Sequence, residues 1–316
     1  MGKILVIGAC GQLGSVLTKT LQEKWGEDNI IASDLRLPSN FDGHFIPLDA
    51  TNYDALNELV ISKQVDEIYH LAAILSANGE KSPLRTWDIN LKSLFNVLEI
   101  SRLNNVKKVF YPSSIAVFGE NVDKNNAGQF SNKLPGTAYG ISKVAGENWC
   151  QYYYNTYTLD VRSIRFPGII GYQSLPGGGT TDYAIDIYHK AVRNKRFVCF
   201  LSEDSSLPMI FMDDAVRSIL EIMDAPKKNI KIRTSYNLSG ISVSPKEITQ
   251  SIQKNYPNFN VIYNPDYRQN IADSWPNDID DSCAKEDWNW QPKYDLDSIT
   301  QIMLQELKKY YAAVKV

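Results

Sequence analysis

A glycine-rich turn near the start of the chain restricts the fold more than any other feature of the sequence. The segment GACGQLG, from Gly8 to Gly14, follows a short apolar run at residues 4–7 and leads into an amphipathic stretch at residues 12–25. Glycines at this spacing allow a tight turn between a strand and a helix, and they let backbone N–H groups approach a pyrophosphate. The turn therefore predicts a strand–turn–helix unit that binds a dinucleotide.

The alternation of strands and helices continues through the first half of the chain. Short runs rich in β-branched residues predict strands at residues 4–7, 30–33, 45–48, 67–71, 108–111 and 161–165. Helical patterns between them predict helices at residues 12–25, 53–62, 86–103 and 139–157. This alternation is typical of a parallel sheet covered by helices on both faces. We therefore expect an α/β protein with a Rossmann-type, doubly wound parallel sheet.

The pattern loosens after Gly168. Helices are expected at residues 182–193, 245–253 and 297–311, another helix opens at residues 212–214, and a strand at residues 235–238 returns to the sheet. We expect a dinucleotide-binding domain of residues 1–168 and 207–240, and a smaller, discontinuous substrate lobe of residues 169–206 and 241–316. Such a lobe would cap the carboxyl edge of the sheet, where ligands bind in folds of this class.

Two aspartates at the ends of expected strands bear on the choice of cofactor. Asp34 lies about 20 residues beyond the glycine turn, where a carboxylate can accept hydrogen bonds from ribose hydroxyls and repel a 2′-phosphate. This favours NAD over NADP, although the nearby Arg36 could accommodate the phosphate. Asp49 is placed to reach the adenine amine. Either aspartate could instead cap a helix or lie in a solvated loop.

An acid/base group is expected on the helix at residues 139–157. Tyr139 and Lys143 stand four residues apart, so they share one face of the helix, where the ammonium group would lower the pKa of the phenol. Ser114, with Ser113 beside it, follows a strand and would hold the oxygen of a substrate. The phenolate could then take a hydroxyl proton as hydride leaves for a nicotinamide. Tyrosine and lysine at this spacing also occur by chance, and the glycine turn upstream favours the catalytic interpretation.

Composition and charge argue against several classes of function. The formal net charge of −3 gives no electrostatic reason to expect nucleic acid or an anionic membrane as a partner. The four cysteines and three histidines are scattered, so we expect no metal site and a reducing compartment. The sequence shows no signal peptide and no apolar stretch of about 20 residues. We expect a cytoplasmic protein, although a processed organellar protein would share these features.

Longer motifs make the chain similar to a known group of enzymes. The general motifs are GACGQLG at 8–14, HLAA at 70–73, YPSSIAVFG at 111–119 and YGISK at 139–143. More specific ones are LSANGE at 75–80, PGGGTTDYAIDIYHKA at 176–191, LPMIFMDDA at 207–215 and DSWP at 273–276. With these motifs the chain resembles the extended short-chain dehydrogenase/reductase superfamily and, within it, the short-chain type of L-threonine 3-dehydrogenases.

The resemblance implies NAD-dependent oxidation of the β-hydroxyl of L-threonine to 2-amino-3-oxobutanoate, a first step of threonine catabolism toward glycine or aminoacetone. It implies that the catalytic residues are Ser114, Tyr139 and Lys143. It implies that the cofactor contacts are Gly8, Gly11, Gln12, Leu13, Gly14, Asp34, Asp49, Ala50, Leu71, Ala72, Ala73, Asn90, Tyr139 and Lys143. It implies that the substrate contacts are Ser76, Ser114, Tyr139, Thr180, Thr181 and Trp275. A homodimer through a four-helix bundle, built on the helices that follow Asn90 and Tyr139, is also typical of the superfamily.

One part of the substrate site is also predicted by the residues themselves. Three glycines at residues 177–179 precede Thr180, Thr181 and Asp182, as in a loop that enters a helix. Threonine hydroxyls and free N–H groups there would form an anion site for a small carboxylate, and the glycines suggest a hinge. The threonines could instead only cap the helix, and Trp275 could be a packing residue. The sequence reveals no group for the substrate ammonium.

Three other functions remain open at this point. A nucleotide-sugar epimerase or dehydratase could use the same scaffold, but its substrate needs basic groups around a larger cleft. A sensor that binds NAD without turnover would have no need of a tuned phenol. An oxidoreductase for another small β-hydroxy acid or amino alcohol is also compatible, because one methyl group is worth only about 1–3 kcal/mol of discrimination.

Overall fold

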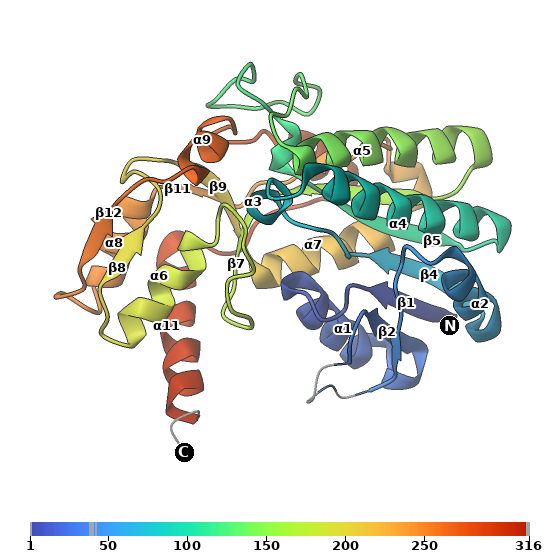
Figure 1. The fold of residues 1–316 in the computed structure, drawn as a ribbon, viewed down its shortest axis with the longest axis horizontal. Helices are drawn as coiled ribbons and strands as arrows, with labels where there is room; N and C mark the ends of the chain where they lie inside the picture. The colour runs from blue at the N-terminus through green and yellow to red at the C-terminus, as the bar shows by residue number, and fades with distance from the viewer. Residues whose placement is uncertain (1, 38–40, 42, 314–316) are drawn as a thin grey trace.

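A seven-stranded parallel sheet forms the centre of the molecule (Figure 1). The computed structural model describes residues 2–37, 41 and 43–313. In the order of the sheet the strands are β10 (Tyr236–Asn237), β6 (Val161–Phe166), β5 (Lys108–Ser114), β4 (Val65–His70), β1 (Lys3–Ile7), β2 (Ile30–Asp34) and β3 (Phe45–Pro47). The chain runs from β1 to β2 and β3 on one side and then crosses to β4 on the other. The switch point therefore lies between β1 and β4, where this fold class binds ligands.

Helices cover both faces of this sheet, as the sequence predicted. The helices α1 (Gln12–Trp25) and α7 (Met212–Asp224) pack on one face, and α2 (Tyr53–Lys63), α4 (Pro83–Leu103) and α5 (Ala138–Tyr157) on the other. Alternate side chains of β1 point to opposite faces, so Ile4 and Val6 join one core while Leu5 and Ile7 join the other. This is why β1 is an unbroken apolar run rather than an alternating one. The predicted α/β, doubly wound fold is confirmed.

A smaller lobe lies at the carboxyl edge of the seven-stranded sheet. A mixed sheet is formed by β11 (Ile241–Val243), β9 (Leu207–Phe211) and β7 (Gly168–Ile170), and a parallel pair by β8 (Phe197–Cys199) and β12 (Val261–Tyr263). The helices of this part are α6 (Tyr183–Val192), α8 (Pro245–Gln253), α9 (Arg268–Asp273) and α11 (Leu296–Ala313). These elements share one hydrophobic core. The division into 1–168 with 207–240 and 169–206 with 241–316 stays a prediction.

The chain crosses back to the large sheet after the lobe. The helix α10 (Ser282–Trp288) contacts β10, and Ala284, Trp288 and Trp290 belong to the hydrophobic core under α1 and α7. Residues 282–290 therefore lie on the dinucleotide-binding side, although they follow residue 241 in the sequence.

A second connection joins the two parts near the cavity. The N–H of Ala127 donates to the carbonyl of Asp278 at 3.1 Å, and the N–H of Asp280 donates to the carbonyl of Ala127 at 3.1 Å. The Lys124 ammonium donates to the carbonyl oxygen of Trp275 at 3.0 Å. These bonds fix the segment that carries Trp275 against a loop of the large domain.

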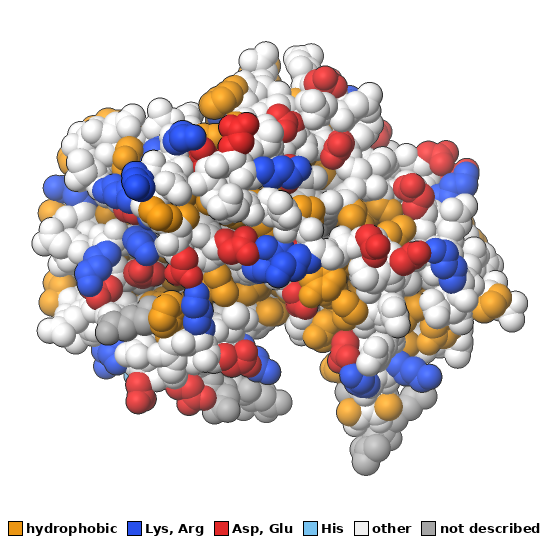
Figure 2. All heavy atoms as spheres, turned by 180° about the vertical axis from the view of Figure 1, so that it is seen from behind, with side chains coloured by type: hydrophobic (Ala, Val, Ile, Leu, Met, Phe, Trp, Pro, Cys, Tyr) orange, Lys and Arg blue, Asp and Glu red, His pale blue; other side chains and the backbone are white. Residues whose placement is uncertain are grey.

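None of the helices within the described residues has the length and apolar character that a bilayer crossing requires. On the face seen in Figure 2, basic and acidic side chains are interspersed and do not gather in a large patch of one sign.

Candidate active site

One cavity lies over the carboxyl ends of β1, β4 and β5 and extends to the lobe. It is bordered by the glycine turn, the start of α5 and the loop that leads into α6. Its lining comprises Gly8, Gly11, Gln12, Leu13, Gly14, Leu71, Ala73, Leu75, Ser76, Pro112, Ser113, Ser114, Ile115, Tyr139, Lys143, Phe166, Pro167, Gly168, Ile169, Gly179, Thr180, Thr181, Asp182 and Trp275. The cavity therefore brings the predicted catalytic and substrate residues and nine of the fourteen predicted cofactor residues into one site.

The glycine turn has the shape of a dinucleotide cradle. Gly8 has a φ of +85°, and a Cβ atom there would lie 2.6 Å from the backbone nitrogen of Ala72. A Cβ atom at Gly14 would lie 2.0 Å from the carbonyl oxygen of Gly8. The side-chain amide nitrogen of Gln12 is buried at this end and has no hydrogen-bond partner within the described residues. A backbone groove without Cβ atoms and a spare buried donor fit a bound pyrophosphate.

Two predicted cofactor residues outside the cavity lining, Asp34 and Asn90, form hydrogen bonds with segments that border the cavity. One carboxylate oxygen of Asp34 accepts from the N–H of Cys10 at 3.0 Å, which places Asp34 at the edge of the glycine turn. Asn90 accepts from the N–H of Ile74 at 2.8 Å and donates to the hydroxyl of Ser142 at 3.2 Å, so it links three segments beneath the site.

Of the other three predicted residues outside the lining, Ala72 has its backbone nitrogen against Gly8 of the turn, and Asp49 and Ala50 lie farther along the same edge of the sheet. Asp49 accepts from the N–H and the hydroxyl of Thr51, at 2.9 and 2.7 Å, as a turn-capping residue would. The carbonyl of Ala50 accepts from the side-chain amide of Asn96 at 2.9 Å. Neither of them lines the cavity, and their contact with an adenine stays a prediction.

The catalytic group sits where α5 begins. The hydroxyl of Thr137 caps the helix by accepting from the N–H of Gly140 at 3.0 Å, which aligns the first turn beside β5. The hydroxyl of Ser114 is near enough to the Tyr139 phenol to influence its pKa, and both residues line the cavity. The Lys143 ammonium donates to the carbonyl of Pro112 at 2.6 Å and lies 5.5 Å from the centre of the Tyr139 ring. Serine, tyrosine and lysine thus converge as predicted.

Burial controls the pKa values of both residues on α5. Burial raises the pKa of Tyr139 to about 12, and the nearby hydroxyl of Ser114 acts against this shift. Burial lowers the pKa of Lys143 to about 7, and the electrostatic influence of Cys150 and Glu147 acts against this shift. The expectation that Lys143 gives Tyr139 a low pKa is therefore wrong for this structure. Desolvation penalises the phenolate, and an amine with a pKa near neutrality carries only part of a positive charge.

The glycines at residues 177–179 are arranged differently from the prediction. The N–H groups of Gly178 and Gly179 donate to one carboxylate oxygen of Asp182, at 2.6 and 2.8 Å, so they are not free. Asp182 turns back on the loop from the position just before α6. The hydroxyl of Thr180 lies 3.2 Å from that of Ser76, within hydrogen-bond distance across the cavity. Burial raises the pKa of Asp182, and the N–H bonds of the loop act against this shift.

Sequence reasoning missed Asp182. It is the only acidic side chain among the described residues that line the cavity. Its place directly after two threonines at the start of a helix was a usable signal, because an aspartate there is well placed to bind loop N–H groups. The described residues hold no group of three or more histidine, cysteine, aspartate or glutamate side chains able to bind a metal ion.

Fold and site together define a nucleotide-dependent enzyme of the extended short-chain type. Residues 4–239 match the NAD dependent epimerase/dehydratase family, and the chain belongs to that family. The family is NAD dependent, so the prediction of NAD as the cofactor is confirmed.

Particular relatives are similar over nearly the whole length. An uncharacterized epimerase/dehydratase of Staphylococcus aureus is 43% identical over 314 residues, which cover 98% of each chain. The holo structure of a GalE-like L-threonine dehydrogenase from Cupriavidus necator is 45% identical, with a TM-score of 0.95 over 97% of this chain and 100% of that one. A monomeric L-threonine 3-dehydrogenase from a metagenome, in its apo form, is 45% identical with a TM-score of 0.95 over 97% and 99% of the two chains.

Proposed function

We propose that this protein oxidises the β-hydroxyl of L-threonine to a ketone with NAD, giving 2-amino-3-oxobutanoate. The observation that carries the proposal is the charge of the cavity. Lys143 is the only basic side chain among the described residues that line it, and Asp182 is the only acidic one. A nucleotide-sugar substrate needs several basic groups for its diphosphate, whereas a small zwitterion needs little more than one carboxylate and a few donors. The likeness to two L-threonine dehydrogenases supports the same substrate.

The residues of the cavity divide the chemistry among them. The glycine turn and Asp34 would hold the dinucleotide, which when bound supplies the hydride acceptor and, in its oxidised form, a positive charge. Ser114 would orient the substrate hydroxyl toward Tyr139, and the ionised phenolate form of Tyr139 would take its proton. Lys143 adds a donor and a partial positive charge beside the phenol. The positive charge of the oxidised dinucleotide would act against the burial that raises the pKa of Tyr139 to about 12.

Asp182 is the group that we assign to the substrate ammonium. Asp182 lines the cavity together with Ser76, Thr180 and Thr181, three of the predicted substrate residues. An ammonium bound to Asp182 competes with the two loop N–H groups, and the N–H groups of Gly178 and Gly179 are then available for the substrate carboxylate. Substrate binding would thus replace the contact between Asp182 and the loop N–H groups with two new contacts. The substrate ammonium would bind Asp182, and the substrate carboxylate would bind the N–H groups of Gly178 and Gly179.

The experiment that tests the function is formation of NADH, followed by absorbance. Purified protein is mixed with NAD and L-threonine, in parallel with L-serine, L-allo-threonine and NADP. Turnover with L-threonine and NAD alone supports the proposal in full. If none of these mixtures forms NADH, the proposal is wrong and the nucleotide-sugar epimerase or dehydratase becomes the leading function.

The proton acceptor is tested by Tyr139→Phe. We expect kcat to fall by about 100- to 10,000-fold, because the variant cannot take the proton, while the dissociation constant for NAD changes little. NAD binding is measured by quenching of tryptophan fluorescence. A variant that retains most of its activity would contradict the role of Tyr139.

The exposed face of α4 and α5 supports a homodimer through a four-helix bundle. Three large apolar side chains of α5 are exposed: Trp149 (39%), Tyr152 (46%) and Ile141 (48%). The ring centres of Trp149 and of Phe95 on α4 are 5.1 Å apart. We expect light scattering to give a dimer for the protein, a monomer for Trp149→Glu, and a dimer for the control Tyr310→Glu on α11. A monomeric protein, as one relative is described, would contradict the dimer. The cytoplasmic location stays a prediction.

A further inference from the structure

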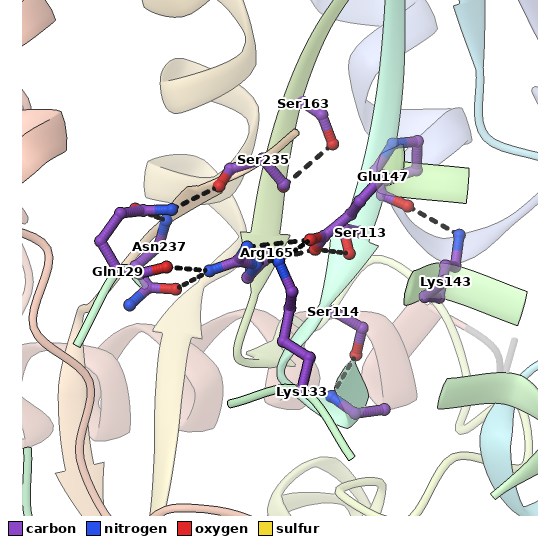
Figure 3. A network of polar contacts seen from close by, with 12 residues as sticks. Ser113, Ser114, Gln129, Lys133, Lys143, Glu147, Ser163, Arg165, Ser235 and Asn237 are labelled. Atoms are coloured by element: carbon purple, nitrogen blue, oxygen red, sulfur yellow. Dashed lines mark hydrogen bonds and ion pairs between the residues drawn. The ribbon is translucent and has the colours of Figure 1, made fainter. Parts of the chain in front are cut away.

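A buried ion pair lies directly behind the catalytic residues. Glu147 on α5 and Arg165 on β6 are both fully buried, and the guanidinium donates to the two carboxylate oxygens at 2.7 and 2.8 Å. Figure 3 shows Ser113 and Arg165 meeting at this carboxylate. The hydroxyl of Ser113 donates to it at 2.6 Å, and the ammonium of Lys133 lies at 3.4 Å. Two cations and one hydroxyl therefore surround a single buried anion.

Ser113 connects this ion pair to the catalytic group. The carbonyl of Pro112 accepts from the Lys143 ammonium, Ser113 donates to Glu147, and Ser114 lies near Tyr139, so three successive residues of β5 face α5. Lys143 and Glu147 stand one helical turn apart on α5. The bond from Ser113 to Glu147 also explains why Ser114, and not Ser113, faces Tyr139.

Resting on the proposed function, we infer that Glu147 is a positioning residue for the reaction. Its first role is mechanical: the carboxylate connects the end of β5 to α5 and so keeps Ser114 and the Pro112 carbonyl next to Tyr139 and Lys143. Its second role is electrostatic: the carboxylate supplies the negative charge that faces the Lys143 ammonium.

The other titratable groups around Lys143 cannot supply that charge. They are Tyr139 and Cys150 on α5, Tyr111 on β5, whose ring centre is 4.5 Å from the ammonium, and His70 on β4. Burial raises the pKa of Cys150 and of Tyr111, so both are neutral near neutral pH. Burial, with the charge of Lys143, lowers the pKa of His70 to about 3, so it is neutral as well. Glu147, paired with Arg165, is the anion that remains.

A purely structural ion pair would behave differently from a positioning residue. If Glu147 only stabilised the fold, its replacement would lower the melting temperature and leave the titration of Lys143 where it was. If it also faces Lys143 electrostatically, removal of its charge would shift that titration to lower pH, because the ammonium loses its counter-charge.

The test compares two variants of the full chain, Glu147→Gln and Ser113→Ala. Lys143 is titrated by competitive labelling with acetic anhydride, in which only the neutral amine reacts, and the labelled peptide is quantified by mass spectrometry. We expect the midpoint to fall by about one pH unit in Glu147→Gln and to stay in place in Ser113→Ala. With NAD and L-threonine, we expect kcat to fall by about 10-fold in both variants, because both release the end of β5.

The outcomes separate the inference from the proposed function. An unchanged Lys143 midpoint in Glu147→Gln overturns the electrostatic role, and an unchanged kcat in Ser113→Ala overturns the tether. Because the labelling needs no turnover, a shifted midpoint in a protein that does not oxidise L-threonine supports the charge effect and sinks only the proposed function. If Glu147→Gln does not fold, Glu147→Gln/Arg165→Gln removes both buried charges. A lowered midpoint is expected there too, and an unchanged one overturns the inference.

Discussion

Two glycine-rich loops border the cavity, and they are built in different ways. In the first, a Cβ atom at Gly14 would lie 2.0 Å from the carbonyl oxygen of Gly8. In the second, the nearest atom to a Cβ atom at Gly177 would be a side-chain carbon of Leu75, at 4.0 Å. Backbone therefore packs on backbone in the first loop, whereas the second has open space around its first glycine.

The hydrogen bonds of the two loops differ in the same way. The N–H groups of Gly8 and Ala9 donate to the backbone carbonyl of Ser33 on β2, at 2.8 and 3.0 Å. The second loop is held by the carboxylate of Asp182, a side chain that can change its charge or its partner. The first loop is therefore fixed by backbone contacts, whereas the conformation of the second depends on one side chain.

The largest effect is expected from Gly14→Ala, with Gly177→Ala as its control. The new methyl group at Gly14 overlaps the backbone of Gly8, so the turn must open, and we expect NAD affinity to fall by about 100-fold or more, equal to about 3 kcal/mol. Gly177→Ala has room for its methyl group and should leave NAD affinity unchanged. Calorimetric titration with NAD measures both. Equal losses in the two variants would remove the distinction between the loops.

Asp182→Asn should act on the substrate and not on the cofactor. We expect KM for L-threonine to rise by about 10- to 100-fold, because an amide offers the ammonium a weaker, uncharged acceptor, while the affinity for NAD stays the same. The control is Asp186→Asn, one turn further along α6, which loses only a partly exposed ion pair with Lys190. Steady-state kinetics with both substrates varied provide the measurement, and an unchanged KM would remove Asp182 from the ammonium site.

Gly178→Ala tests whether the loop at residues 177–179 changes conformation during turnover. Gly178 has a φ of +97°, which an alanine adopts at a cost of about 1–2 kcal/mol, so the variant should favour a rearranged loop. We expect kcat/KM for L-threonine to fall by about 10-fold with little change in melting temperature. Gly136→Ala, where a Cβ atom meets nothing within 4 Å, is the control. A normal kcat/KM in Gly178→Ala would mean that the loop conformation is not used in turnover.

The smallest effect is a dependence of KM on pH. Burial raises the pKa of Asp182 above the ordinary 3.8, so its carboxylate takes up a proton at a higher pH than an exposed aspartate. Because a protonated carboxyl binds an ammonium weakly, KM for L-threonine should rise several-fold as the pH falls toward that pKa. The rise should be absent from Asp182→Asn. Initial rates across the acidic range, with NAD saturating, check both expectations.

The parts that the sequence predicted well are encoded by neighbours along the chain. The glycine turn, the strands β1 and β2, and the Tyr139–Lys143 face of α5 each depend on a spacing within one element. Some predicted helix boundaries still differ from the structure, since α4 begins at Pro83 and not at residue 86. Proline at the first turn of a helix is a start signal that the apolar pattern does not contain.

The parts that were missed depend on contacts between distant segments. The strands β7, β8, β11 and β12 have three residues each, too few for a periodic pattern. The Glu147–Arg165 pair joins a helix to a strand, and the bond of Asp182 to its loop replaces the free N–H groups that the sequence predicted. No local spacing distinguishes a buried, paired charge from a solvated one, because the partner is chosen by the fold.

The position of β10 at the edge of the large sheet has a consequence for synthesis of the chain. This two-residue strand pairs with β6 only after residue 237 of 316, about three quarters of the way along. Until then the growing chain presents one unpaired edge of β6, and unpaired edges invite association with other chains. Chaperone contact with ribosome-bound chains should therefore persist until this strand emerges and then drop. Crosslinking of stalled chains ending before and well after residue 237 would show whether that drop occurs.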